Sequence, residues 1–533
     1  MKRLHRLLMF FVLCAILGCT KIPPKLTADD PEHPANPFYH MLTYDWRGLP
    51  VDPTGNSECQ PQIKSSTQGN EPKLCNGRYA LLRPFTELED YERYIDNVLK
   101  AREDYFNRTG NPKVLIFVHG GLNTLKGSIE RALKLHKLIE KGDPGYFPIF
   151  INWQASLTAS YFDHLFNVRQ GEEWEAWARP FSWLLSPFYL AADLARSIGR
   201  APLTWAFQYK SDVASSLLWE TMEEKDVKVL LPILRQQKFQ VLYGGACPNL
   251  PNATSRDGDC RSWTEAVRSS LKYVITQPFK IVTGPFIDGF GTSAWESMLR
   301  STHQLFHHED EFHTNNEEVV RNHLTGSNEV QGRGGLSKFM RRLQEKMPSY
   351  GPSNWDITVV GHSMGTIVLN EMIRRFGDFN YSSIVYMAAA CSVREYEDSM
   401  FPYLEKKPDT KFYHLMLHEA AEVRDRWEKF PGFVDLPPRG SLLVWIDSFF
   451  TKPATHLDMR AGRWINLAVS AHNTPEKIRE RISFLVFRAG ESVSQTDPQR
   501  HGDFTQCPFW KSNFWKPVEE GQKEHCFLNN LLE

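Results

Sequence analysis

Apolar and polar positions follow a repeating pattern along two stretches of the chain. In the first stretch, an apolar run at 112–118 is followed by helical spacing over 125–141 and by a second apolar run at 146–153. Short apolar runs bounded by turn residues are typical of buried strands, and a recurrence every three to four residues is typical of helices. This part of the chain is therefore predicted to fold as strand, helix, strand.

The pattern resumes in the second half of the chain. Apolar runs at 357–360, 382–388, 411–417 and 481–487 predict four more strands, and the spacing over 366–375 predicts a helix directly after the first of them. Strands that alternate with helices at this spacing favour a parallel sheet with right-handed crossovers. The predicted fold class is α/β, a mostly parallel sheet flanked by helices.

A long segment at 156–350 separates the two stretches. It contains several predicted helices rich in aromatic residues and proline, none with the length and purity of a transmembrane helix. It is too long for a crossover connection, so we interpret it as a mainly helical cap or lid; a subdomain with only a packing role is the alternative. The predicted core is then 108–155 with 351–533, preceded by a loop-rich segment and a helix at 38–107.

The N-terminus has the features of an export signal. Residues 1–6 are basic and 7–17 are apolar but too short to span a bilayer. The stretch then ends in Gly18-Cys19-Thr20, which resembles a bacterial lipobox. That resemblance implies a signal peptide at 1–18, lipidation of Cys19, and a polar, proline-rich tether at 19–37. Thr20 in place of aspartate implies the outer membrane, facing the periplasm. A plain cleaved signal or an uncleaved anchor is the alternative.

Composition and cysteine spacing agree with an exported globular protein. The chain has 533 residues, 41% of them hydrophobic, and a formal net charge of −1, so it lacks the basic field that nucleic acid requires. Six cysteines form three pairs close in sequence, Cys59 with Cys75, Cys247 with Cys260 and Cys507 with Cys526. Three local disulfides in an oxidising compartment are expected, with Cys391 as a buried thiol; the spacings do not fit a zinc site.

The strand at 357–360 leads into Gly361-His362-Ser363-Met364-Gly365 and then into the helix at 366–375. A G-x-S-x-G sequence between a strand and a helix is typical of a serine nucleophile on a strained turn. The glycines leave room for that turn, and the N-terminus of the helix stabilises developing negative charge. Ser363 is therefore the candidate nucleophile; an ordinary glycine-rich turn is the alternative.

Three segments together are similar to the α/β-hydrolase superfamily, in its lipase and esterase branch. They are VLIFVHGG at 114–121, VVGHSMG at 359–365 and RHGDF at 500–504, and the similarity covers 113–155 and 356–505. It implies an α/β-hydrolase fold and a triad in the order serine, acid, histidine.

The resemblance also implies roles for individual residues. His501, in the loop after the last strand, is the expected base, with His472 and His418 as poorer candidates. Glu422 is the expected acid, and its rivals are Glu419, Asp425 and, more remotely, Asp447. The oxyanion hole is expected at the backbone N–H groups of Gly121 and Met364.

These features predict a serine hydrolase that cleaves carboxylic esters, expected to be lipid-like, through an acyl-enzyme on Ser363. An acyltransferase that uses the same triad is one alternative, and a non-catalytic envelope binding or scaffold protein is another. No metal or organic cofactor is expected; His303, His307, His308 and His313 with 309–311 are interpreted as a solvated helix end. The expected partners are the substrate and, through the N-terminal anchor, the membrane. The sequence does not fix the oligomeric state.

Overall fold

A computed structural model describes the following residues: 37–53, 85, 88–142, 145–169, 172–173, 181–216, 222–245, 247, 259–307, 334–347, 355–425, 438–517 and 526. The predicted signal peptide, Cys19 and almost all of the tether lie outside these residues, as do Cys59 and Cys75.

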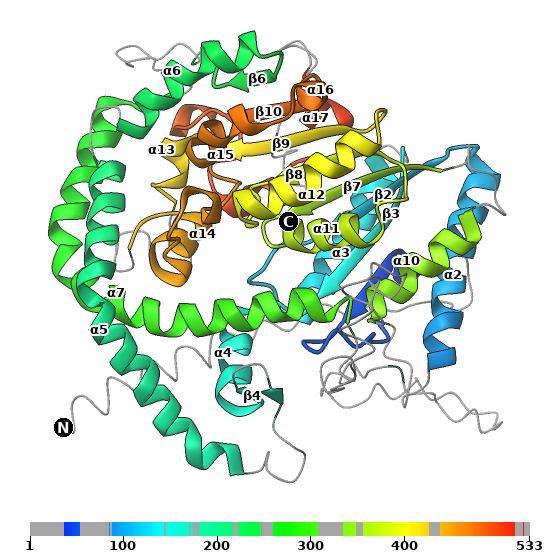
Figure 1. The fold of residues 1–533 in the computed structure, drawn as a ribbon, viewed down its shortest axis with the longest axis horizontal. Helices are drawn as coiled ribbons and strands as arrows, with labels where there is room; N and C mark the ends of the chain where they lie inside the picture. The colour runs from blue at the N-terminus through cyan, green and yellow to red at the C-terminus, as the bar shows by residue number, and fades with distance from the viewer. Residues whose placement is uncertain are drawn as a thin grey trace, which may run out of the picture. The chain divides into compact units, whose positions relative to one another are not determined.

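An eight-stranded sheet forms the centre of the molecule, in the order β1-β3-β2-β7-β8-β9-β10-β6, and all its neighbouring strands are parallel (Figure 1). The strands are β1 (Met41–Tyr44), β2 (Lys113–Val118), β3 (Phe147–Trp153), β6 (Gln240–Tyr243), β7 (Asp356–His362), β8 (Tyr381–Met387), β9 (Lys411–Leu417) and β10 (Ile482–Phe487). A separate antiparallel pair consists of β4 (Val168–Arg169) and β5 (Glu172–Glu173). The central strands are buried along almost their whole length, as parallel strands covered on both faces must be. The α/β class and the mostly parallel sheet are confirmed.

Helices flank this sheet (Figure 1). The longer ones are α2 (Leu88–Thr109), α3 (Leu125–Gly142), α4 (Leu157–Phe166), α5 (Ser182–Ser216), α6 (Met222–Gln236), α7 (Trp263–Gln304), α10 (Gly335–Lys346), α11 (Gly365–Arg375) and α12 (Val393–Lys406). Short helices follow in the C-terminal part: α13 (Glu419–Glu422), α14 (Leu442–Trp445), α15 (Trp464–Ser470), α16 (Glu476–Arg479) and α17 (Ser512–Trp515). Helix α12 begins after Ser392, which forms a reciprocal capping box with Glu395.

Two edge strands differ from the expectation. The segment at 38–85, expected to be loop-rich, contributes β1, which pairs with β3 through Met41 and Phe150. The insertion at 156–350 contributes β6, which pairs with β10 at the other edge of the sheet. Its last helix, α10, packs on α2 through the Arg342–Asp96 ion pair at 2.8 Å. The insertion is mainly helical as expected, but parts of it complete the core as well as covering it.

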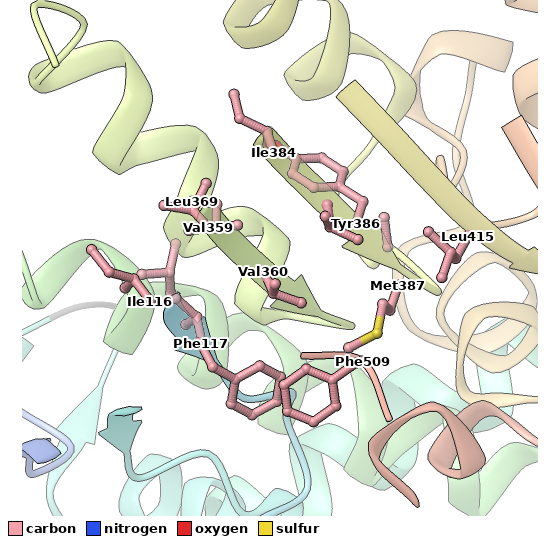
Figure 2. Packing of buried hydrophobic residues seen from close by; sticks show 14 of the residues in the cluster. Ile116, Phe117, Val359, Val360, Leu369, Ile384, Tyr386, Met387, Leu415 and Phe509 are labelled. Carbon is pink, nitrogen blue, oxygen red and sulfur yellow. The ribbon is translucent and has the colours of Figure 1, made fainter. Parts of the chain in front are cut away.

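The hydrophobic core lies between the sheet and its helices and includes the segments with candidate chemistry. Figure 2 shows Phe117 of β2, Val360 of β7 and Met387 of β8 directed into one cluster. Phe509, from the C-terminal segment, stacks on Phe117 with ring centroids 4.4 Å apart. Packing of this kind fixes the ends of the central strands, because close-packed side chains leave little freedom to the backbone.

Two disulfides lie within the described part of the chain, Cys247–Cys260 and Cys507–Cys526, and Cys391 is a buried free thiol. All three observations match the sequence expectation, and the disulfides are typical of a protein that folds in an oxidising compartment. Among the described helices, none combines the length and the apolar character needed to cross a membrane.

Candidate active site

Ser363 stands in a strained turn between β7 and α11. Its φ is 53°, in the left-handed region that residues other than glycine rarely adopt. Its backbone N–H donates to the Met387 carbonyl at 2.9 Å, and its own carbonyl accepts from the N–H groups of Thr366 and Ala390, each at 3.1 Å. Such strain costs about 1–3 kcal/mol and persists only where surrounding contacts hold it, as these three hydrogen bonds do.

The two glycines of the turn are required by close contacts. A Cβ on Gly361 would lie 2.8 Å from Leu369 Cδ1, and a Cβ on Gly365 would lie 2.3 Å from the Val118 carbonyl oxygen. The second contact is with backbone, which cannot rotate away. The first turn of α11 therefore packs directly against the end of β2.

Replacing Gly365 with alanine is expected to lower the free energy of unfolding by at least about 2 kcal/mol, because β2 or α11 must move to admit the methyl group. Urea denaturation measures this effect. Gly199→Ala in α5 is the matched control: nothing lies within 4 Å of its added Cβ, so this change should stabilise the protein by up to about 1 kcal/mol. Equal effects of the two substitutions would contradict the packing described here.

The turn after β2 lies against the Ser363 turn. A Cβ on Gly120 would lie 2.7 Å from Ser363 Cβ, and one on Gly121 would lie 2.6 Å from Met364 Sδ. Asn123 Nδ2 holds the turn by donating to the carbonyls of Gly120 and Gly121 at 2.9 and 3.1 Å. Within the residues that the structure describes, the backbone N–H groups of Gly121 and Met364 donate to no acceptor. The two N–H groups expected to form an oxyanion hole are thus brought to the same place.

His119 stabilises the same turn. Its Nε2 accepts from the Trp153 backbone N–H at 3.0 Å, so Nδ1 carries the proton and donates to the Gly120 carbonyl at 2.6 Å. Burial lowers the pKa of His119 to about 4, and the ring is neutral at physiological pH. Its role is to shape the turn.

His501 is held next to the Ser363 turn by its backbone. Its N–H donates to Asp425 Oδ2 at 2.9 Å, and its carbonyl accepts from His362 Nε2 at 2.9 Å. The rings of His362 and His501 are 5.2 Å apart between centroids. Since His362 directly precedes Ser363, this contact ties the loop after β10 to the turn after β7. Sequence reasoning did not single out His362; its only signal was its place inside the motif.

The His501 ring is neutral and forms no hydrogen bond within the described residues. Neither ring nitrogen has a hydrogen bond among the described residues, and the same is true of Ser363 Oγ. Burial, and secondarily the nearby His362, hold the pKa of His501 well below its usual range. A neutral imidazole has a free lone pair and can accept a proton, as a general base must.

The candidate acids differ sharply in their surroundings. Glu419 pairs with Arg463, and Asp447 accepts from the backbone of Arg460 and lies 3.3 Å from its side chain. Glu422 is fully buried and accepts from the Ser441 hydroxyl, and burial raises its pKa to about 8. Asp425 is the acid that contacts His501, through the backbone N–H.

The structure thus brings Ser363, Gly121, Met364 and His501 into one place. Among the described residues, Ser363 and His501 share no hydrogen bond, and no carboxylate accepts a hydrogen bond from the His501 ring. The poorer candidate bases lie elsewhere: His418 caps α13 and bonds Tyr243 at 3.0 Å, and His472 bonds Val469.

The acids can be separated by substitution. Asp425→Ala is expected to lower kcat at least about tenfold, because it releases the backbone of the base. Glu422→Gln is expected to leave kcat within about threefold at neutral pH, because a carboxyl whose pKa is about 8 is largely protonated there. Steady-state kinetics on a soluble ester measures both. A larger loss in Glu422→Gln than in Asp425→Ala would make Glu422 the acid.

The site is closed in this conformation. Ser363 is 1% exposed and His501 is 8% exposed. Met298 of α7 covers the glycine turn, with its Cε 2.8 Å from the position of a Cβ on Gly121. A cavity of about 310 Å³ is lined by Asp425 and by other charged side chains that include Arg424 and Arg500. Ser363 is therefore almost inaccessible from solvent in this conformation.

The histidine cluster near the end of α7 does not assemble a metal site within the described residues. His303 lies 3.8 Å from Glu371, and His307 accepts from Arg375 at 2.7 Å. His308, His313 and residues 309–311 lie outside the described residues.

Comparisons with protein-family models, with curated proteins and with solved structures gave no match to this chain. The assignment of a reaction therefore depends on the geometry of the site.

Proposed function

We propose that this protein is a serine hydrolase of the α/β-hydrolase type, which cleaves carboxylic esters through an acyl-enzyme on Ser363. The observation that carries the proposal is the left-handed conformation of Ser363 at the end of a central parallel strand, beside two unbonded backbone N–H groups. Backbone strain of this kind is concentrated at functional sites, and buried polar atoms without partners require an explanation.

The proposed reaction uses these groups in two steps. His501 removes the proton of Ser363 Oγ as the oxygen attacks the acyl carbonyl, and the N–H groups of Gly121 and Met364 stabilise the resulting oxyanion. Collapse of the tetrahedral intermediate expels the alcohol, which takes the proton from His501. Water, deprotonated by the same histidine, then attacks the acyl-enzyme and releases the acid. No metal or organic cofactor takes part in this scheme.

Asp425 positions His501 in this proposal, and Glu422 lies one helical turn earlier. The sequence favoured Glu422, but its raised pKa makes it a weak partner for an imidazolium, which needs an ionised carboxylate. Asp425 already fixes the His501 backbone. Because the His501 ring makes no hydrogen bond to Ser363 here, the side chain would have to rotate on this fixed backbone to reach it.

A lipid-like ester is the proposed substrate class, and the cell envelope is the proposed location. The support is the lipobox-like sequence ending at Cys19, the disulfides, and the apolar helices of the insertion, one of which carries Met298 over the site. The closed site favours one alternative, a non-catalytic envelope protein with a hydrolase-like fold.

Turnover of acyl esters tests the proposal. Incubation with p-nitrophenyl esters of short and long acyl chains should release the free acid, with or without an added alcohol or amine. Transfer of the acyl group mainly to the acceptor would identify an acyltransferase. No release from any ester by the full chain, in detergent and on vesicles, would favour the non-catalytic alternative.

A further inference from the structure

Two long helices of the insertion, α5 and α7, pack side by side (Figure 1). Trp205 Nε1 of α5 donates to the Ile281 carbonyl of α7 at 2.8 Å. A Cβ on Gly289 would lie 3.1 Å from Ser197 Cβ, so the helices approach closely at a small residue on each. Close approach at glycine and serine, with hydrogen bonds between helices, is the packing mode of helices in a lipid environment.

Polar side chains lie inside this helix pair. Each of the following is at most 9% exposed: Asp193, Ser197, Thr204 and Gln208 of α5, and Thr276, Lys280 and Asp288 of α7. Asp288 pairs with Lys452 at 2.6 Å and bonds Thr204 at 3.4 Å. Charged and amide side chains are rarely buried in a protein that is surrounded by water.

Apolar side chains lie outside the pair. Among the exposed residues of α5, eight recur at spacings of four and three: Leu184, Phe188, Ala191, Ala195, Ile198, Pro202, Trp205 and Tyr209. On α7 the exposed residues that form the corresponding stripe are Trp263, Val267, Leu271, Val274, Ile275, Phe279, Val282, Phe286 and Phe290. Residues at these spacings share one helix face, so each helix presents a continuous apolar stripe about 40 Å long. We call the two stripes together the outer face of the α5–α7 pair.

Few charged side chains reach the surface along the two helices. Between 182 and 209 and between 263 and 290 they are Arg196, Arg200, Glu265, Arg268 and Lys272. Glu265 pairs with Arg424 at 2.9 Å and Arg268 pairs with Glu491 at 2.6 Å; both, with Lys272, line the cavity beside Asp425 rather than the outer face. An exposed apolar face of this size marks a contact with a membrane or a protein, and Trp and Tyr are enriched at the level of lipid headgroups.

The helix pair is attached to the body of the protein on its other side. A Cβ on Gly291 of α7 would overlap the Phe450 ring, and Thr292 donates to the Phe449 carbonyl at 3.4 Å. The pair can therefore present only one face to a membrane, which places it along the bilayer surface.

We propose that the outer face of the α5–α7 pair binds the surface of a lipid bilayer, with its aromatic and aliphatic side chains at the boundary between headgroups and acyl chains. This contact is separate from the lipid expected on Cys19, and it does not depend on the proposed hydrolase activity.

A local environment probe tests this proposal in the full chain. An environment-sensitive fluorophore is attached to cysteine in Phe188→Cys and, separately, in Phe279→Cys; the native side chains are 71% and 58% exposed. Labelled wild type gives the background, because Cys391 is buried. Vesicles of phosphatidylethanolamine with phosphatidylglycerol should shift the emission to the blue, and lipids with a quencher on the acyl chain should quench it.

Two controls make the result specific. The same probe in Lys406→Cys should not respond; this side chain is 62% exposed and precedes β9, so it lies at the amino-terminal edge of the sheet. Adding Ile198→Asp to the Phe188→Cys protein should reduce the shift severalfold, and Ile198→Leu should not. Ser363→Ala should leave the shift unchanged, which separates this proposal from the proposed function.

Unchanged emission at positions 188 and 279 on vesicles to which the protein is attached would overturn the proposal. A shift that appears without vesicles and grows with protein concentration would also overturn it, in favour of contact between copies of the chain.

Discussion

Replacing Ser363 with alanine is expected to lower ester turnover by a factor of about 10⁴ or more, because no other group in the site can form the acyl-enzyme. The fold should persist, since the chain already holds an alanine, Ala388, at a φ of 46°. Steady-state hydrolysis of a p-nitrophenyl ester measures the loss, and thermal unfolding checks the fold.

Ser399→Ala is the matched control for this experiment. Ser399 is 2% exposed and its Oγ has no partner among the described residues, as for Ser363, but it lies in α12. Its loss should leave turnover within about twofold. Full turnover in Ser363→Ala would refute the proposed mechanism.

The second large effect is expected in stability at acid pH. Seven buried histidines have lowered pKa values: His40 and His414 at about 3, His119, His362 and His418 at about 4, His501 well below its usual range, and His136, whose pKa burial also lowers. Each is neutral in the folded protein and can take up a proton in the unfolded chain below pH 6.5. Their stabilising contribution is therefore complete above pH 6.5 and is lost as the pH falls towards the folded-state pKa.

His414 isolates this effect because burial alone lowers its pKa. It lies in β9 among the rings of Tyr386, Tyr396 and Phe412, at centroid distances of 5.6, 5.9 and 5.8 Å, and neither ring nitrogen has a hydrogen bond among the described residues. The stability of His414→Phe relative to wild type should rise by about 1.4 kcal/mol for each pH unit below 6.5, reaching about 2.7 kcal/mol near pH 4.5.

Urea denaturation across this pH range measures the difference. Phe412→Leu is the control: it removes packing without a titrating group, so its effect on the free energy of unfolding should not depend on pH. A His414→Phe effect that is equally independent of pH would mean that His414 is not held neutral by burial. Glu422 has the opposite effect. Because its pKa is raised in the folded protein, its contribution to the free energy of unfolding increases as the pH falls from about 8 to 4.5. The pH dependence of the wild type alone therefore does not isolate the histidines.

The sequence predicted the central strands because each is a short apolar run that must be buried on both faces. It did not predict β1 and β6, which have four residues each and lie at the edges of the sheet. A run of four residues is too short to show a clear periodicity. These segments are extended because they pair with β3 and β10, which are distant in sequence.

The acid could not be chosen from the sequence for a related reason. Glu419, Glu422 and Asp425 lie within two helical turns of one another, so local pattern cannot separate them. What separates them is contact with distant residues: Arg463 neutralises Glu419, Ser441 bonds Glu422, and His501 bonds Asp425. The sequence also did not predict that the α5–α7 pair has polar side chains inside and apolar side chains outside, because helical spacing alone does not say which face is buried.

In the proposed mechanism, Ser363 is a nucleophile activated by His501. A fluorophosphonate probe, with the modified residue mapped by mass spectrometry, tests it most directly because the probe reacts with activated serines whatever the natural substrate. A single covalent adduct is expected on Ser363, absent in Ser363→Ala and strongly reduced in His501→Ala. An unmodified Ser363 in the folded wild-type chain, or equal labelling of the His501→Ala variant, would contradict it.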